Sequence, residues 1–216
     1  MGRELERLTV FDIKNHENLE SVCKTLRGFI EQHHQIYDLP VLGEYWENLL
    51  SKSLRSLNIE NDWTPDLNHV QGVDLIIDKG LRVSCKTGQV TGQRKNNLKF
   101  SGSRMTKHLS LKEKLCFLSE KRDDVYMLLS RSKKEWEAGE KKYYFIAFPS
   151  NMLQYSNMEW KDTFKKRGKN RGTKNGHRAS SETIDASISF AMSHQLWTII
   201  KDFKDNENIF VKEISV

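Results

Sequence analysis

The feature that most constrains the fold is a change in the period of the hydrophobic pattern near residue 72. Before that point, apolar residues recur every three or four positions over 15–37 and again over 42–57, which predicts two amphipathic helices. After it, residues 72–78 form a short run rich in β-branched side chains, and residues 81–87 alternate between apolar and polar. Because Lys79-Gly80 is a turn signal between these runs, we predict that two helices are followed by a β-hairpin.

The rest of the chain continues this mixture of helices and strands. Residues 88–107 fit a long loop or an irregular strand pair, residues 165–178 a glycine-rich basic loop, and residues 184–190 either a strand or a helix. Further strands are expected over 125–130, 142–148 and 209–216, and further helices over 109–121, 150–164 and 193–205. The order predicts one domain over 1–216, with an α/β fold in which helices flank a mixed central sheet.

Several protein classes are excluded by composition and hydropathy. No apolar run approaches the roughly 18 residues that a membrane helix requires, and the first residues lack the apolar stretch of a secretory signal. The three cysteines, Cys23, Cys85 and Cys116, are far apart and form no CxxC pair, so neither a disulfide framework nor a zinc site is expected. A cytoplasmic location is the natural expectation from this cysteine usage.

The charge is distributed in a way that predicts binding to a polyanion. The net charge is +6, but residues 79–112 hold nine basic residues and no acid, and residues 165–178 hold seven basic residues and no acid. Sixteen of the 35 Lys and Arg residues lie in these two segments, which leaves nineteen against 29 Asp and Glu elsewhere. Nucleic acid is the expected partner of two basic segments on an acidic body, although two solvated lysine-rich loops would have the same composition.

The predicted hairpin carries the residues best suited to chemistry. Asp74 lies in its first strand, and Ser84 and Lys86 lie two residues apart in its second strand, so both point to one face while Cys85 points to the other. A carboxylate beside a lysine suits metal-assisted hydrolysis of phosphodiesters, with Asp74 holding a divalent cation and Lys86 orienting the attacking water or stabilising the phosphate charge.

A single carboxylate is a weak basis for predicting a Mg²⁺ site, because Mg²⁺ prefers oxygen ligands and a second carboxylate is needed. The second predicted helix offers Glu47, which follows the buried-looking Trp46 and could reach toward Asp74, and Glu44 is the reserve candidate one turn earlier. His33 and His34 are adjacent on the first helix, so their side chains diverge and no metal site is expected there.

This helix followed by a hairpin resembles the PD-(D/E)XK nuclease superfamily, in its Val73-Asp74-Leu75 and Ser84-Cys85-Lys86 runs and the helix pattern Gly43-x-x-Trp46-Glu47-x-Leu49. Ser84 stands where most members carry an acid. The resemblance is to a subset of type II restriction endonucleases that have an SXK triplet and take the missing acid from a helix, here Glu47. It implies Mg²⁺-dependent cleavage of double-stranded DNA by a homodimer that leaves 5′-phosphates. Asp74 and Glu47 would ligate the metal with the backbone carbonyl of Cys85, Lys86 would position the water, and Ser84 would hydrogen-bond within the site.

The two basic segments supply the expected DNA contacts. Gln, Asn and Arg side chains read base edges in the major groove, whereas Lys suits phosphates. The candidates are Gln89, Gln93, Arg94, Lys95, Asn96, Asn97, Lys99, Arg104, Lys107, Lys169, Arg171, Lys174 and Arg178. Two other functions stay open on the sequence: a less specific repair, recombination or modification-dependent nuclease, and a nucleic-acid-binding protein without catalysis.

Overall fold

The structure is a computed structural model of the 216-residue chain. It describes residues 16–62, 73–78, 80–92, 94–105, 110–120, 123–155, 158–164, 166, 169, 171–181, 184–191 and 195–216. No helix within these ranges is long and apolar enough to cross a membrane.

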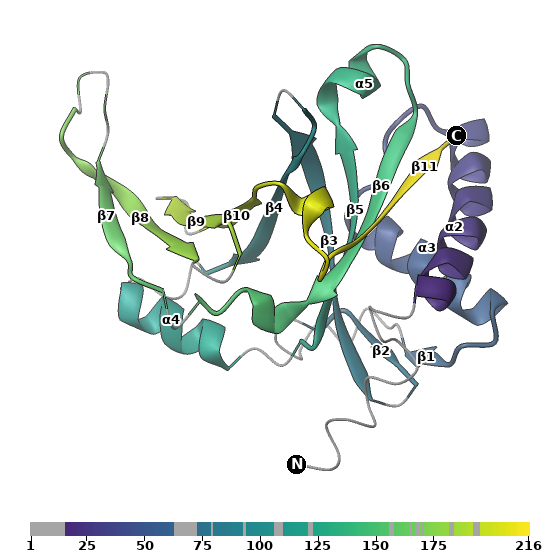
Figure 1. Cartoon of the computed structure of the whole chain (residues 1–216), viewed down its shortest axis with the longest axis horizontal. Helices are drawn as coiled ribbons and strands as arrows, with labels where there is room; N and C mark the ends of the chain where they lie inside the picture. The colour runs from purple at the N-terminus through teal and green to yellow at the C-terminus, as the bar shows by residue number, and fades with distance from the viewer. Residues whose placement is uncertain are drawn as a thin grey trace.

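One mixed sheet organises the described residues (Figure 1). Its strands run in the order β11-β6-β5-β3-β4-β10-β9-β8-β7, with β2 added beside β3 and β1 beside β2. The strands are β1 (Asn61–Asp62), β2 (Leu75–Ile77), β3 (Leu81–Thr91), β4 (Asn97–Arg104), β5 (Val125–Ser132), β6 (Lys142–Pro149), β7 (Lys161–Phe164), β8 (Lys174–Ser181), β9 (Ala186–Ala191), β10 (Gln195–Ile200) and β11 (Phe210–Ser215). Strands β3 and β5 pair in parallel, whereas the other strand pairs among the described residues are antiparallel.

Two long helices cover one face of the sheet. Helix α2 (His16–Ile36) and helix α3 (Gly43–Ser56) bury apolar side chains at three- and four-residue spacings, including Leu26, Ile30 and Trp46. They pack with one set of alternate residues from β3, β5, β6 and β11, which together form the helix-side core. The two predicted N-terminal helices are therefore confirmed.

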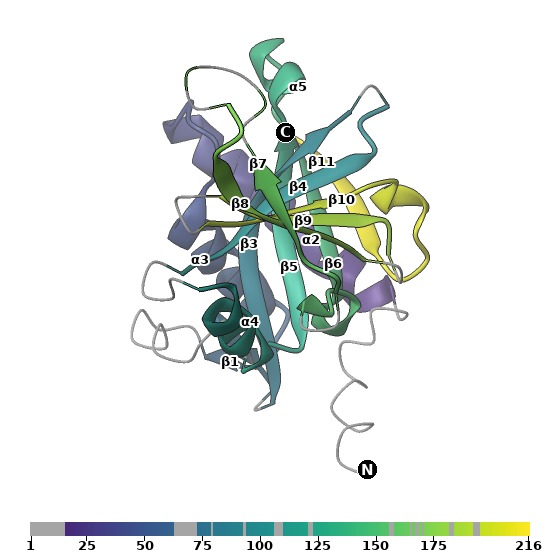
Figure 2. The ribbon, with the colours of Figure 1, turned by 90° about the vertical axis from the view of Figure 1, so that its left-hand side faces the viewer.

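The other face of the sheet forms a second core. Val125, Met127 and Leu129 of β5 belong to the helix-side core, while Tyr126 and Leu128 between them belong to the second core. This second core also takes apolar residues from β4, β9, β10 and helix α4 (Leu111–Ser119). Figure 2 shows β9 and β10 running across the nearly upright β3 and β5, so the sheet twists strongly between its two halves.

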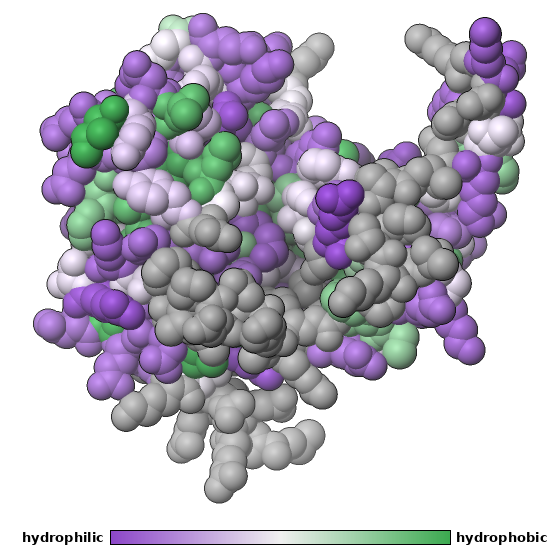
Figure 3. Space-filling model, turned by 180° about the vertical axis from the view of Figure 1, so that it is seen from behind, coloured by the Kyte–Doolittle hydropathy of each residue, from purple (hydrophilic) through white to green (hydrophobic). Residues whose placement is uncertain are grey.

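The described residues of the two basic segments lie mostly in two separate hairpins, β3–β4 and β7–β8. Strands β3 and β4 carry much of 79–112, and β8 carries the end of 165–178. Both hairpins rise on the same side in Figure 1, and the space-filling view in Figure 3 is hollowed between the β7–β8 projection and the rest of the molecule.

The expected fold class, a mixed sheet with flanking helices, is confirmed, but several expected elements are wrong. The described part of 150–164 holds a 3₁₀ turn (Ser150–Met152) and edge strand β7 rather than a helix, and the described part of 193–205 is β10 followed by a 3₁₀ turn (Phe203–Asp205). Strand β10 is a clear case, because its side chains alternate between half-buried and buried, and four of its six residues are of the β-branched or aromatic types that favour strands. The strand pair expected as an alternative for 88–107 is present as β3 and β4, and the ambiguous 184–190 is strand β9. Short helix α5 (Lys133–Glu137) was not expected.

A candidate metal-assisted active site in a fork of the sheet

Strand β3 changes its neighbour halfway along its length. Residues 81–83 pair with β2, and residues 88–91 pair with β4, while β5 follows β3 over 83–90 on the other side. Residues 84–87, which we call the β3 fork, therefore have no strand partner on the β2/β4 side in the described part of the chain. Backbone groups at such an edge are open to side chains and ligands.

Asp74 fills one side of this fork. Asp74 immediately precedes β2, and its backbone N–H donates to the carbonyl of Val83 on β3 at 2.8 Å. Its carboxylate oxygen Oδ2 accepts hydrogen bonds from the backbone N–H of Cys85 at 2.7 Å and from Ser84 Oγ at 3.4 Å. The carboxylate therefore takes the place of a strand partner for β3.

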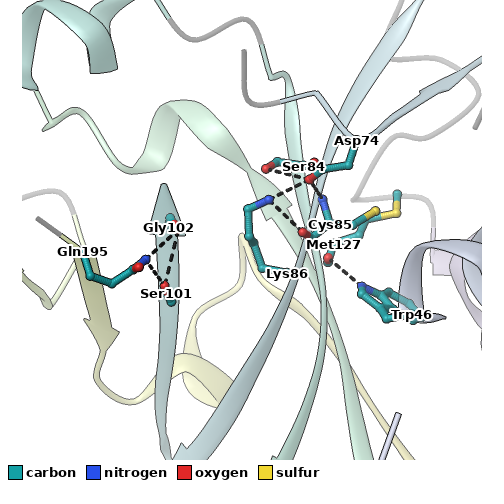
Figure 4. Close-up of polar contacts among 9 residues, drawn as sticks. All are labelled: Trp46, Asp74, Ser84, Cys85, Lys86, Ser101, Gly102, Met127 and Gln195. Atoms are coloured by element: carbon teal, nitrogen blue, oxygen red, sulfur yellow. Dashed lines mark hydrogen bonds and ion pairs between the residues drawn. The ribbon is translucent and has the colours of Figure 1, made fainter. Parts of the chain in front are cut away.

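Lys86 completes a cluster around the same oxygen (Figure 4). Its Nζ lies 2.6 Å from Asp74 Oδ2 and 2.8 Å from the carbonyl oxygen of Cys85. The side chains of Asp74 and Lys86 are each 19% exposed, so the pair is screened from water yet open to a ligand. One carboxylate oxygen and one carbonyl oxygen thus converge on a single cation-binding position.

The alternation of β3 separates the polar cluster from the helix-side core. Val83 and Cys85 pack into that core, so Ser84 and Lys86 point to the opposite face. In Figure 4, Lys86 lies on one side of β3 and Trp46 on the other, where its Nε1 donates to the carbonyl of Met127 at 3.4 Å. Burial raises the pKa of the Cys85 thiol, and the nearby charge of Asp74 raises it further. The thiol is therefore protonated near neutral pH, and only the backbone carbonyl of Cys85 is suited to a hard cation.

Glu47 lies on the helix side of this cluster. It is half-buried on α3, and its charge is among the causes that raise the pKa of the Cys85 thiol, after burial and Asp74. Two carboxylates, from Asp74 and Glu47, therefore lie within electrostatic range of Cys85. The side chain of Glu44 lies outside the described residues.

Sequence reasoning missed a tyrosine and a second acid beside the fork. Tyr126 is the register partner of Ser84 on β5, and its hydroxyl hydrogen-bonds with Tyr155 and with the carboxylate of Asp123. Burial raises the pKa of Tyr126, and the charges of Asp123 and Asp74 raise it further. Asp123 thus lies near the site, two residues before β5, the strand next to β3. The acids immediately before the strand expected at 125 were the signal in the sequence that could have identified it.

The predicted DNA contacts fall into an exposed group and a group with partners in the protein. The exposed side chains are Gln89, Arg94, Arg104, Lys169, Arg171, Lys174 and Arg178, and Lys99 and Asn97 are half-buried. Gln93 and Lys107 lie outside the described residues.

Four of these side chains form hydrogen bonds or ion pairs within the fold, and two of the four, Lys174 and Arg178, are exposed as well. Lys95 forms an ion pair with the buried Glu135, and Asn96 donates to Asp202 and Asp205 at 2.9 and 2.7 Å. Lys174 Nζ lies 2.9 Å from Asp162 Oδ1, and Arg178 Nε donates to Ser187 Oγ at 2.9 Å. The first two contacts fix the tip of the β3–β4 hairpin rather than leaving these side chains available for base reading.

Comparison with known proteins adds no relative to this picture. No family model, no curated protein and no solved structure matches the chain.

Proposed function

We propose that the protein is a metal-dependent nuclease that hydrolyses phosphodiester bonds of double-stranded DNA. The observation that carries this proposal is the position of Lys86 Nζ, held by Asp74 Oδ2 at 2.6 Å and by the Cys85 carbonyl at 2.8 Å. A site that holds an ammonium with two converging oxygens has the charge and the donor type that a hard divalent cation requires.

The donor set suits Mg²⁺ better than a transition metal. Among the described residues, no group of three or more His, Cys, Asp or Glu side chains is arranged to hold a metal ion. Mg²⁺ does not need such a group, because it usually keeps several waters and binds through one or two carboxylates together with substrate phosphates. Asp74 and the Cys85 carbonyl would hold the ion, with Glu47 as the second carboxylate.

The residues of the fork then have distinct roles. When bound, the cation would neutralise charge on the phosphate and increase the acidity of a nearby water. Lys86, released from Asp74 when the cation takes its place, would orient that water and stabilise negative charge on the reacting phosphate. Ser84 would keep the Asp74 carboxylate in position by its hydrogen bond.

The distribution of basic side chains supports DNA as the substrate. The exposed cations of the β3–β4 hairpin and of β8 lie on two hairpins that rise on one side of the molecule with a hollow beside the β7–β8 projection (Figures 1 and 3). Cations on either side of an open space suit the two phosphate backbones of a duplex.

More specifically, we propose that this nuclease is a type II restriction endonuclease that acts as a homodimer. One fork per chain can cut one strand, so a double-strand cut at a palindromic site calls for a second copy related by a two-fold axis. The corner between α2 and α3 is a candidate for the shared surface, because Ile36, Tyr37 and Leu39 are 75%, 52% and 73% exposed there.

The test is digestion of a supercoiled plasmid of known sequence in Mg²⁺ and in EDTA. Wild-type protein should cut only with the metal, whereas Asp74→Asn and Lys86→Ala should lose about two to three orders of magnitude in rate. Asp185→Asn is a matched control, because it breaks an exposed ion pair with Lys201 (2.8 Å) outside the fork. Cutting by Asp74→Asn at the wild-type rate would overturn the assignment.

The products separate the finer alternatives. A restriction enzyme gives discrete fragments with mapped ends, while a less specific nuclease gives a smear. Binding that needs no divalent metal, with no cleavage under any condition, would identify a binding protein in place of an enzyme.

A further inference from the structure

A second polar pocket lies next to the fork. It encloses about 250 Å³, and its lining includes Thr87, Gln89, Lys99, Ser101, Arg131 and Trp197. Thr87 follows Lys86 directly in the chain, but the alternation of β3 places it with Cys85 on the helix-side face, so the pocket and the Lys86 cluster lie on opposite faces of the sheet. Its volume is slightly below the range of about 300–1,000 Å³ that holds drug-sized ligands, which suits one small ligand.

The pocket is cationic. Lys99 from β4 and Arg131 from β5 both line it, and neither has an ion pair with a carboxylate in the described part of the chain. No Asp or Glu is among its described lining residues. Hydroxyl groups of Thr87 and Ser101 add hydrogen-bonding capacity beside the two cations. This combination favours a phosphate group.

The pocket also has an aromatic wall. The ring of Trp197 lines it, and Lys99 Nζ lies 4.7 Å from the ring centroid. Gln89 is exposed at the same pocket, and its amide can donate to and accept from a polar ring edge. An indole face with a nearby amide suits a nucleobase, since every base has a face that stacks on aromatic side chains.

We propose that this pocket binds a single nucleotide, with the phosphate at Lys99 and Arg131 and the base against Trp197. The inference goes beyond the proposed nuclease function, because the pocket lies on the face of the sheet opposite Lys86 and would take a free nucleotide. Ser101 is already oriented for this role, because Gln195 donates to its hydroxyl and to the carbonyl of Gly102, the latter at 3.0 Å (Figure 4).

Binding can be measured without cleavage. Deoxynucleoside monophosphates are titrated into the full-length protein in EDTA, and tryptophan fluorescence and calorimetry are recorded. The nucleotide should quench fluorescence, and Trp197→Phe should abolish the quench, whereas Trp160→Phe should retain it because Trp160 stacks on Phe190 outside the pocket. Lys99→Ala and Arg131→Ala should each weaken binding about tenfold, as expected for loss of one charge-assisted hydrogen bond.

Two comparisons make the result decisive. Lys86→Ala should bind the nucleotide as wild type does, and loss of binding in that variant would place the ligand at the fork and overturn the proposal. Equal affinity for deoxyribose 5-phosphate and for the nucleotide would also overturn it, because the base would then contribute nothing. Since no step depends on cleavage, nucleotide binding can fail while the plasmid test succeeds, and the reverse.

Discussion

Lys86 Nζ lies 2.6 Å from Asp74 Oδ2, although Asp74 precedes β2, Lys86 lies on β3 and the two residues are twelve positions apart. The same ammonium lies 2.8 Å from the carbonyl of Cys85, so it occupies the position that a metal would take in the proposed nuclease. Lys86 and the metal ion of the proposed nuclease would therefore compete for the same two oxygens, Asp74 Oδ2 and the carbonyl oxygen of Cys85.

This competition predicts opposite effects of two substitutions on metal affinity. Lys86→Met removes the ammonium and should tighten Mn²⁺ or Mg²⁺ binding about tenfold, because the cation no longer displaces a charge-assisted hydrogen bond. Asp74→Asn removes the carboxylate and should weaken binding. Isothermal titration calorimetry in the absence of DNA measures both. Weaker binding by Lys86→Met would contradict the shared position.

The identity of the second carboxylate can be tested by a pair of isosteric substitutions. Glu47→Gln should weaken metal binding about tenfold, because the amide keeps the shape of the side chain but removes the charge beside Cys85. Asp123→Asn should have a smaller effect, because that carboxylate already hydrogen-bonds with Tyr126. The reverse order would assign the second carboxylate to Asp123.

Gly88 is the position of β3 where a methyl group should be least tolerated. A Cβ there would lie 2.6 Å from Ser130 Oγ and 3.0 Å from the carbonyl of Lys99. Gly88→Ala should lower the free energy of unfolding by about 1–3 kcal/mol, measured by urea denaturation. Gly28→Ala is the control, since nothing lies within 4 Å of its Cβ on α2, and it should stabilise by about 0.5–1 kcal/mol. Equal effects of the two would contradict the packing at Gly88.

Stability should fall as the pH is lowered through the range in which histidine titrates. His34 is enclosed between the carbonyl of Tyr37, at 3.0 Å from Nδ1, and the hydroxyl of Tyr143, at 2.9 Å from Nε2. Burial lowers its pKa, so below a pH of about 6.5 the unfolded chain binds a proton that the folded protein resists. The contribution is complete above that pH and is lost as the pH falls toward the folded-state pKa.

Urea denaturation of wild type and His34→Gln at several pH values checks this sign. The substitution should flatten the dependence of unfolding free energy on pH, whatever its effect at neutral pH. His177 should account for part of the remaining slope, because burial lowers its pKa as well. A slope unchanged by His34→Gln would show that the ring titrates normally.

The sequence was informative where a repeating pattern coincided with burial on one face. The stripe on α2 and the alternation of β3 predicted both elements, together with the placement of Lys86 opposite Cys85. It failed where apolar and polar residues were mixed over short spans. Residues 161–164 carry an edge strand that depends on pairing with β8, a contact that local sequence does not encode.

The fork itself depends on long-range pairing that no local pattern contains. Asp74 and Lys86 meet because β2 leaves β3 after Val83 and β4 joins it at Gly88. Tyr126 lies beside Ser84 only because β5 pairs with β3 in parallel, across a connection that includes β4 and α4. The polar cluster of the hairpin could therefore be predicted from residue types, whereas its surroundings required the sheet.

Strand β3 also has a consequence for how the molecule unfolds. It contributes Val83 to the helix-side core and Val90 to the second core, on either side of the fork. Neither core can come apart without releasing one end of this strand, so partial unfolding of either half would dismantle the fork as well. The amide protons of β3 should exchange with solvent only in the largest cooperative opening, and the proposed active site would then be among the most slowly exchanging parts of the molecule.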